Sequence, residues 1–229
     1  RVRSIAVDRD NVAWIGMDSG LGKLSAGEKV FEHYSFNKNA PRNNIDHGVW
    51  SMLNNSDSTL WLGTSKGLIL FNKVNHQFTV YPRRADPRLF VSAIAKDHQG
   101  NLWISDYGRL GVFNVHDKIY NSFYKPPDFP VHGIKDFRID RAGNIWMGSN
   151  ANGIYAYFPE SNRFKSFPNN LFKDQIARSI RSIFEDSRKN LWFIRGATLF
   201  RWDRMTNELT SFGEPPHVNT MGNTWGTIM

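Results

Sequence analysis

The chain has 229 residues, of which 40% are hydrophobic and 22% are charged, and these globular proportions exclude a disordered chain. It carries a formal net charge of +8 at pH 7 and no cysteine, which excludes a disulfide scaffold and a cysteine-based zinc site. Every apolar run is far too short to cross a bilayer as a helix. Aromatic residues reach 14%, a proportion that favours a β-rich fold.

Five tryptophans recur along the chain at intervals of 42 to 47 residues. In chain order they are Trp14, Trp61, Trp103, Trp146 and Trp192. The clearest copies read Asp-x-x-Gly-Asn followed by Leu or Ile and the Trp, as from Asp97 to Trp103. Apolar residues stand twelve and nine positions before each Trp, and a pair of aromatic or apolar residues closes each copy. Fixed offsets in five copies indicate a structural repeat.

Each copy predicts four short strands joined by turns. In the third copy these strands cover 91–96, 102–105, 110–114 and 119–123. The first turn contains Asp, Gly and Asn, which bond to their own downstream backbone or tolerate a positive φ. An amphipathic helix would need apolar residues at i, i+3, i+4 and i+7, and no segment sustains that pattern.

Four antiparallel strands in about 44 residues are typical of a β-propeller blade, whereas a β-sandwich has no reason to repeat its sequence. We therefore predict an all-β propeller whose repeat Trp packs against the neighbouring blade. The predicted blades are 1–36, 44–82, 89–124, 133–168 and 178–213, and 224–229 is the first strand of the next blade. About five blades and one extra strand predict a piece of a larger ring, of six to eight blades.

The repeat unit resembles the two-component regulator propeller repeat over essentially the whole chain. This resemblance implies a seven-bladed ring in the periplasmic sensor of a hybrid two-component regulator of the Bacteroidetes type. It also implies an oligosaccharide ligand, a following β-sandwich module, a histidine kinase elsewhere in the full-length chain and a homodimer. The second copy departs from the repeat because it lacks the Asp and the Gly of the turn, with Asn55 in the Asp position, and Ser105 and Ile194 replace a Gly in the third and fifth copies.

Ligand-binding residues of a propeller are expected on the loops of one face. The longest loops, 35–48, 82–90, 124–133, 168–179 and 213–224, share that face with the loops between the second and third strands. Rings that stack on sugars and arginines that grip anions suit a neutral or anionic oligosaccharide. The candidates on these loops are His47, Tyr107, Arg109, His132, Arg178 and Arg195. First-strand positions beside the channel mouth add Trp50, Lys135 and Arg181. For any one of them, a solvated loop side chain is the alternative.

The basic charge allows an anionic glycan or a nucleic acid as partner. Lys and Arg are spread through every copy without a run of five or six, so we expect neither nucleic-acid binding nor membrane contact by this chain. The seven His residues show no metal-ligand spacing, and we expect no metal and no cofactor.

No catalytic residue is predicted, because a Gly-x-Ser-x-Gly elbow and a Walker loop are both missing from the sequence. The second hypothesis is a propeller enzyme, a lyase or hydrolase acting on a polysaccharide or a small molecule. It stays open because a glycosidase needs only a suitably spaced carboxylate pair. A sensor gene should continue into a membrane span and a kinase, whereas an enzyme gene should close its ring and stop.

Overall fold

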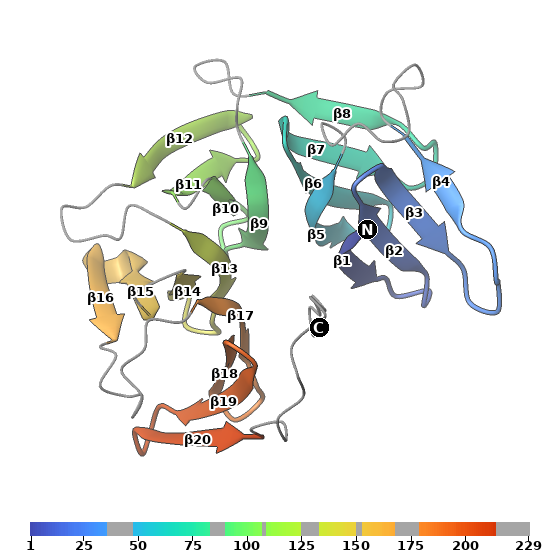
Figure 1. Ribbon diagram of the computed structural model, residues 1–229. Helices are drawn as coiled ribbons and strands as arrows, with labels where there is room; N and C mark the ends of the chain where they lie inside the picture. Colours follow the sequence, from blue (N-terminus) through green and yellow to red (C-terminus); the bar gives the residue numbers. More distant parts are fainter. Residues whose placement is uncertain are drawn as a thin grey trace.

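The computed structural model describes residues 1–35, 48–82, 90–106, 109–124, 133–149, 153–167 and 179–213. Within these ranges, five four-stranded antiparallel sheets follow one another along the chain, each built from four consecutive strands. The sheets are arranged around a common centre with their first strands innermost (Figure 1). The prediction of an all-β propeller with four-stranded blades is confirmed.

The five sheets are named blades 1 to 5 in chain order. Blade 1 contains β1 (Val2–Val7), β2 (Ala13–Met17), β3 (Gly20–Leu24) and β4 (Glu32–Tyr34). Blade 2 contains β5 (Val49–Ser56), β6 (Thr59–Thr64), β7 (Gly67–Asn72) and β8 (Phe78–Tyr81). Blade 3 contains β9 (Val91–Lys96), β10 (Leu102–Asp106), β11 (Arg109–Asn114) and β12 (Ile119–Tyr124).

Blade 4 contains β13 (Ile134–Ile139), β14 (Ile145–Ser149), β15 (Ile154–Phe158) and β16 (Arg163–Phe167), with the short 3₁₀ helix η2 (Pro159–Ser161) before its last strand. Blade 5 contains β17 (Ile180–Glu185), β18 (Leu191–Arg195), β19 (Thr198–Asp203) and β20 (Glu208–Phe212). The turns that join the first strand to the second, and the third to the fourth, lie at one end of every blade. We call this end the turn face and the opposite end the loop face.

The Asp of the repeat joins the first turn to the Trp of the same blade, and we call this arrangement the Asp–Trp latch. Asp97 Oδ1 accepts hydrogen bonds from the backbone N–H of Gln99 at 3.0 Å and of Asn101 at 2.8 Å. Its Oδ2 accepts the Nε1–H of Trp103 at 3.0 Å. The same indole bond joins Asp8 to Trp14, Asp140 to Trp146 and Asp186 to Trp192, at 2.8 to 2.9 Å.

In three of the latches, hydrogen bonds to the carboxylate lower the pKa of the Asp. Burial opposes ionisation of Asp186, but hydrogen bonds from Trp192 and Asn190 outweigh it and lower the pKa of Asp186 to about 2. The pKa values of Asp8 and Asp140 are lowered in the same way, by bonds that include the indole of each blade. A single carboxylate therefore sets the turn and the orientation of the Trp ring together.

Blade 2 lacks the latch because Asn55 stands in the Asp position. The Asn55 amide donates to Thr59 Oγ1 at 2.9 Å, and the buried Nε1–H of Trp61 has no hydrogen-bond partner among the described residues. An unpaired buried N–H carries a desolvation penalty of about 1–3 kcal/mol. The departure seen in the sequence at Asn55 therefore has a structural cost within its own blade.

We call the contacts between neighbouring blades seams. At two seams, a basic residue of the following blade contacts the Asp of the latch. Lys73 Nζ lies 3.1 Å from Asp8 Oδ2, and Arg204 Nη1 lies 2.8 Å from Asp140 Oδ2. Both basic residues stand twelve positions after the Trp of their own blade. In blade 3 that position is Val115, which packs against the cluster around Trp61. The apolar Val115 therefore faces the blade whose turn has lost its carboxylate.

Four apolar clusters fill the four seams between neighbouring blades. At the seam between blades 4 and 5, Trp146 packs with Ile180, Ile183, Phe193 and Trp202. The rings of Trp146 and Trp202 meet edge to face, with their centroids 5.7 Å apart. The prediction that the repeat Trp packs against the next blade is confirmed, and the core of the protein consists of seams between sheets.

Close approach of the blades explains the Gly that stands two positions after the Trp. A Cβ added to Gly63 would lie 2.7 Å from the carbonyl oxygen of Val91 in blade 3 and 2.2 Å from Ser51 Oγ. Blade 3 places a Ser there instead, and its cross-strand partner is Ala93 where blade 2 has Ser51. Ser105 Oγ donates to the Ile134 carbonyl at 3.4 Å, as Ser4 Oγ donates to the Val49 carbonyl at 3.3 Å. The hydroxyl at the seam thus comes from the first strand in blade 1 and from the second strand, at Ser105, in blade 3.

The ring of described strands is open between blade 5 and blade 1 (Figure 1). Val2 and Ile5 on β1 are 56% and 43% exposed, whereas Val49 and Ile94, at the equivalent positions of later blades, are 0% and 4% exposed. The side of blade 1 that contains Val2 and Ile5 is apolar like a seam, but no neighbouring blade covers it among the described residues. It agrees with the expectation of a larger propeller. Residues 224–229, predicted as a further first strand, lie outside the described residues.

We expect Gly63→Ala to destabilise the protein more than Gly22→Ala. The new Cβ at residue 63 would meet the Val91 backbone across the seam, whereas at residue 22 the nearest atom is the flexible Met17 Cε at 3.0 Å. Overpacking of this kind costs about 1–3 kcal/mol. Urea unfolding of both variants measures the difference, and equal losses would contradict close approach at the seam.

Candidate functional site

The first strand of every blade contains a β-bulge next to the loop face. The register with the second strand shifts there, leaving one residue without a cross-strand partner. The bulged residues are Arg3, Trp50, Ser92, Lys135 and Arg181. A bulge re-aims a side chain and is common beside binding sites. Three predicted site residues, Trp50, Lys135 and Arg181, therefore occupy one ring of equivalent positions.

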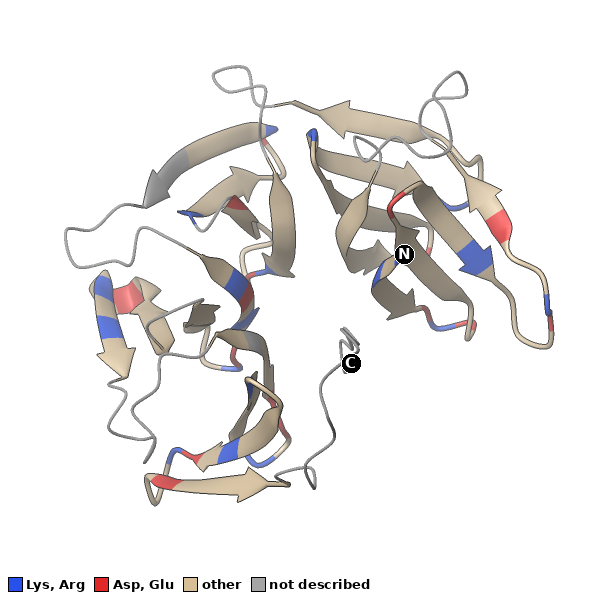
Figure 2. Ribbon diagram, viewed as in Figure 1, with Lys and Arg blue, Asp and Glu red and all other residues tan. Residues whose placement is uncertain are grey.

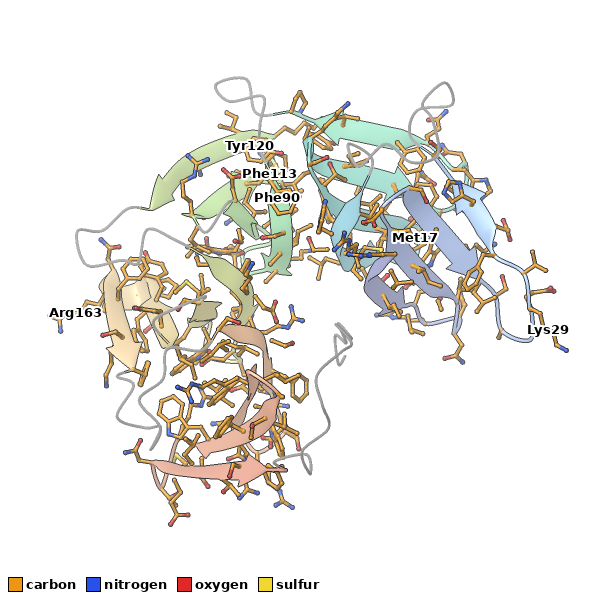
Figure 3. The ribbon with its side chains drawn as sticks, in the orientation of Figure 1. Met17, Lys29, Phe90, Phe113, Tyr120 and Arg163 are labelled. Carbon is orange, nitrogen blue, oxygen red and sulfur yellow. The ribbon has the colours of Figure 1, made fainter. Side chains whose placement is uncertain are left out.

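Two further side chains surround Trp50 and come from the neighbouring blades. The guanidinium carbon of Arg3 lies 4.1 Å from the centroid of the Trp50 ring, and Arg3 Nε donates to Asp18 Oδ1 at 2.5 Å. Phe90, just before β9, meets the Trp50 ring edge to face with centroids 4.9 Å apart. Met17, next to Asp18, and Phe90 are labelled in Figure 3. The stack thus joins blades 1, 2 and 3, and the arginine covers one face of the indole.

Arg109 is held by a carboxylate at the end of β10. Asp106 is fully buried, its Oδ1 accepts the backbone N–H of Phe90 at 3.0 Å, and its Oδ2 pairs with Arg109 Nη2. Asp106 stands three positions after the repeat Trp, where blades 2 and 4 have the buried Thr64 and Ser149. Each of those hydroxyls closes the loop after its strand, onto Gly67 O at 2.9 Å and Gly153 O at 3.1 Å. Asp106 instead bonds the backbone before β9 and the side chain of Arg109 at the start of β11.

Arg195 and Lys135 have opposite surroundings. Arg195 stands at the position of Asp106 in blade 5 and is only 3% exposed, so its role is within the fold. Lys135 is exposed on β13, and its side chain has no partner among the described residues. Basic residues on the inner strand β13 are visible in Figure 2.

Asp136 follows the bulge of blade 4 and faces blade 5. Its Oδ2 accepts the backbone N–H of Ile183 at 3.1 Å and the hydroxyl of Ser182 at 3.3 Å, and its Oδ1 lies 3.4 Å from Arg138 Nη1. Burial raises the pKa of Asp136, against the opposing effects of Arg138 and of these hydrogen bonds. The equivalent residues of the other described blades are Ser or Ala, so a carboxyl at this strand position occurs in blade 4 alone among the five described blades.

The structure brings together Trp50 with Arg3 and Phe90, and places Arg109 and Lys135 on the same face. We call these five residues the loop-face mouth. The predicted residues His47, Tyr107, His132 and Arg178 lie outside the described residues, and Arg181 is described only as part of the strand β17. Arg3 and Phe90 were missed by the sequence analysis, although Arg3 stands eleven positions before its Trp, as Trp50 and Lys135 do.

Two kinds of site are missing from the part of the chain that the structure describes. No three His, Asp or Glu side chains there are grouped so that they could hold a metal ion. No helix there is long and apolar enough to span a membrane.

Comparison with known protein families assigns one repeat directly. Residues 87–108, which contain the third repeat Trp, match the family described as two component regulator propeller. The chain carries a two-component regulator propeller repeat. The resemblance predicted from the Asp-x-x-Gly-Asn-Leu-Trp unit is therefore confirmed. A search of curated proteins found no match.

Solved structures share the propeller fold of this repeat protein. The extracellular domain of the hybrid two component system BT4673 from B. thetaiotaomicron superposes with a TM-score of 0.74 at 20% identity, over 91% of this chain and 27% of that chain. The equivalent domain of BT3049 from the same organism gives 0.65 at 18% identity, over 92% of this chain and 34% of that one.

Virginiamycin B lyase from Staphylococcus aureus is also similar in fold, with a TM-score of 0.73 at 17% identity, over 94% of this chain and 70% of the lyase. Likeness at such low identity extends to the fold alone. The chain spans about a quarter to a third of the two-component system domains that it matches.

We expect Asp136→Asn to raise the midpoint of thermal unfolding at pH 7. The folded protein raises the pKa of this carboxyl, so its ionisation costs stability as the pH rises from the unfolded value of about 3.8. The amide carbonyl can still accept the Ile183 N–H without carrying a charge. Thermal unfolding from pH 7 down to pH 3 should show the gap between wild type and variant closing. A gap that widens on acidification would contradict the assignment, and Asp10→Asn, at an exposed turn, is the matched control.

Proposed function

We propose that this chain is the ligand-sensing propeller of a hybrid two-component regulator and lies outside the cytoplasm, in the periplasm. Two findings support the proposal. The third copy matches the two component regulator propeller family, and extracellular domains of two-component systems share the fold over more than nine-tenths of this chain. The chain spans only part of those domains, so signalling requires further parts.

In this proposal, the further parts are additional propeller blades, a β-sandwich module and a kinase. The open sides of blades 1 and 5 pack against further blades of the same chain, and a β-sandwich module connects the propellers to a kinase across the membrane. The full-length protein acts as a homodimer. A ligand that binds one arrangement of the propellers more tightly shifts the dimer equilibrium by that difference in affinity.

The ligand in this proposal is an oligosaccharide bound at the loop-face mouth. The observation that carries this step is the contrast between the two ends of the blades. At the turn face, the latch carboxylates are bonded to indoles and, at two seams, to a basic residue of the next blade. At the loop face, the bulges present an indole, an arginine and a lysine that has no partner among the described residues, all at equivalent positions. Aromatic rings and guanidinium groups are what a sugar with polar or anionic substituents requires.

Titration calorimetry against a panel of neutral and acidic oligosaccharides tests the proposal, with chromatography of each mixture to detect turnover. We expect binding without product, and an affinity at least about tenfold lower in Trp50→Ala because a stacking surface is lost. Phe31→Ala, which removes a ring that is 53% exposed beside β4, should leave the affinity unchanged.

Each other outcome has a definite meaning. Formation of a cleaved product would support the propeller enzyme instead, as in the lyase whose fold is similar. Absence of binding to every member of the panel would overturn the oligosaccharide ligand. Binding that is equally weakened by both variants would move the site away from the loop-face mouth.

A further inference from the structure

Arg3 is held on two sides by groups of its own blade and of the next. Its Nε–H is bound to Asp18 and its planar face lies on the indole of Trp50. Although burial opposes ionisation of Asp18, the hydrogen bond and the charge of Arg3 lower the pKa of that carboxyl, so the pair is ionised at neutral pH. The guanidinium therefore has a fixed orientation before any ligand arrives.

The two Nη atoms form the other edge of the same guanidinium. Neither Nη atom of Arg3 has a hydrogen bond to any of the described residues, and the side chain is 26% exposed. A guanidinium presents five N–H donors in a rigid fork, and here only one of them is occupied within the described residues.

Arg204 shows what a fully structural arginine looks like in this protein. Its Nε donates to the Lys189 carbonyl at 2.7 Å, its Nη1 to Asp140 at 2.8 Å, and its Nη2 to Glu185. All three nitrogens thus have protein acceptors, and the side chain is 19% exposed. Arg3, like Arg204 over Trp146, lies over an indole and pairs with a carboxylate, but its Nη atoms have no acceptor among the described residues.

We propose that Arg3 forms an oxyanion subsite of the loop-face mouth, in which its two Nη groups bind a carboxylate or sulfate group. A guanidinium edge matches two oxygens of such a group through parallel N–H···O bonds. Because Asp18 and Trp50 already fix the side chain, little rotamer entropy is lost on binding. The proposal rests on the loop face being the binding face, as proposed above, but not on the ligand being an oligosaccharide.

The position of the subsite also implies roles for Trp50, Phe90 and Asp18. The Arg3 bulge is equivalent to that of Trp50 in the next blade, so a ligand whose anionic group reaches Arg3 lies beside the Trp50 and Phe90 rings. Asp18 acts as a positioning residue, since it contacts Arg3 through Nε and leaves the Nη edge free. The recognised chemistry is an oxyanion attached to an apolar or sugar ring.

The test uses small probes of known chemistry in a titration followed by NMR of the backbone amides. Sodium glucuronate is compared with glucose, and sodium sulfate with sodium chloride, at constant ionic strength. The two anionic probes distinguish a carboxylate from a sulfate. We expect saturable shifts near β1 and β5 with at least one anionic probe and none with glucose or chloride.

The variants are Arg3→Gln, Arg3→Lys and the matched control Arg9→Gln, which removes the same charge from a side chain that is 87% exposed at the turn face. Arg3→Gln should weaken anion binding by about tenfold or more, the cost of charged hydrogen bonds worth about 1.5–3 kcal/mol. Arg3→Lys, which keeps the charge without the fork, should fall between Arg3→Gln and wild type. Arg9→Gln should bind as wild type does.

Outcomes for this subsite and for the proposed function are separable. Saturable anion binding that depends on Arg3 supports the subsite even if no oligosaccharide binds. Anion binding that is absent from wild type, unchanged by Arg3→Gln, or lost equally in Arg9→Gln overturns the subsite and leaves the sensor proposal standing. If Arg3→Gln does not fold, as judged by circular dichroism, Arg3→Lys decides the question, since wild-type affinity in that variant would contradict a bidentate contact.

Discussion

In each blade that has a latch, one Asp carboxylate bonds both the turn between the first two strands and the indole of the repeat Trp. Asp97 caps the turn between the first two strands and also holds the indole that enters the seam. Turn formation within a blade and packing between blades are thereby linked through a single side chain. Because each seam closes only when both blades present their first and second strands correctly, the arrangement of the ring depends on this local bond. Blade 2 packs its Trp61 into the seam without this bond, because Asn55 stands in the Asp position, and the Trp61 indole then has no hydrogen-bond partner among the described residues.

This construction separates the two faces of the propeller. The turn face contains the latches and the ion pairs that Lys73 and Arg204 make with them across two seams. The loop face begins at the bulges, where the backbone pattern is constant and the side chain varies from Arg to Trp, Ser and Lys. A constant bulge with a variable side chain lets each blade contribute a different contact without changing the scaffold. The proposed sensor site and the oxyanion subsite at Arg3 both use this property.

The fold could be predicted from the sequence because the latch and the seam glycine recur at fixed offsets from the Trp. The sequence did not predict that blade 3 moves the Ser from the first strand to the second, as Ala93 and Ser105 show. That change depends on cross-strand pairing, which the repeat does not reveal. Trp50 and Lys135 were found at the mouth from their place in the first strand. Arg3 was missed although it has the same place in its own first strand, because what distinguishes it is its contacts with Asp18 and Trp50 in three dimensions. Arg195 was expected to bind ligand, but a basic residue in a loop and a buried one look alike in sequence.

The dependence of the fold on the latch is tested most directly by urea unfolding of Asp97→Ala and Asn55→Ala. Asp97→Ala removes the acceptor of two backbone N–H groups and of the Trp103 indole, whereas Asn55→Ala acts in a blade whose indole already has no described partner. The account predicts a loss of about 1–3 kcal/mol or more for Asp97→Ala and a clearly smaller loss for Asn55→Ala. Equal losses in the two variants would contradict it.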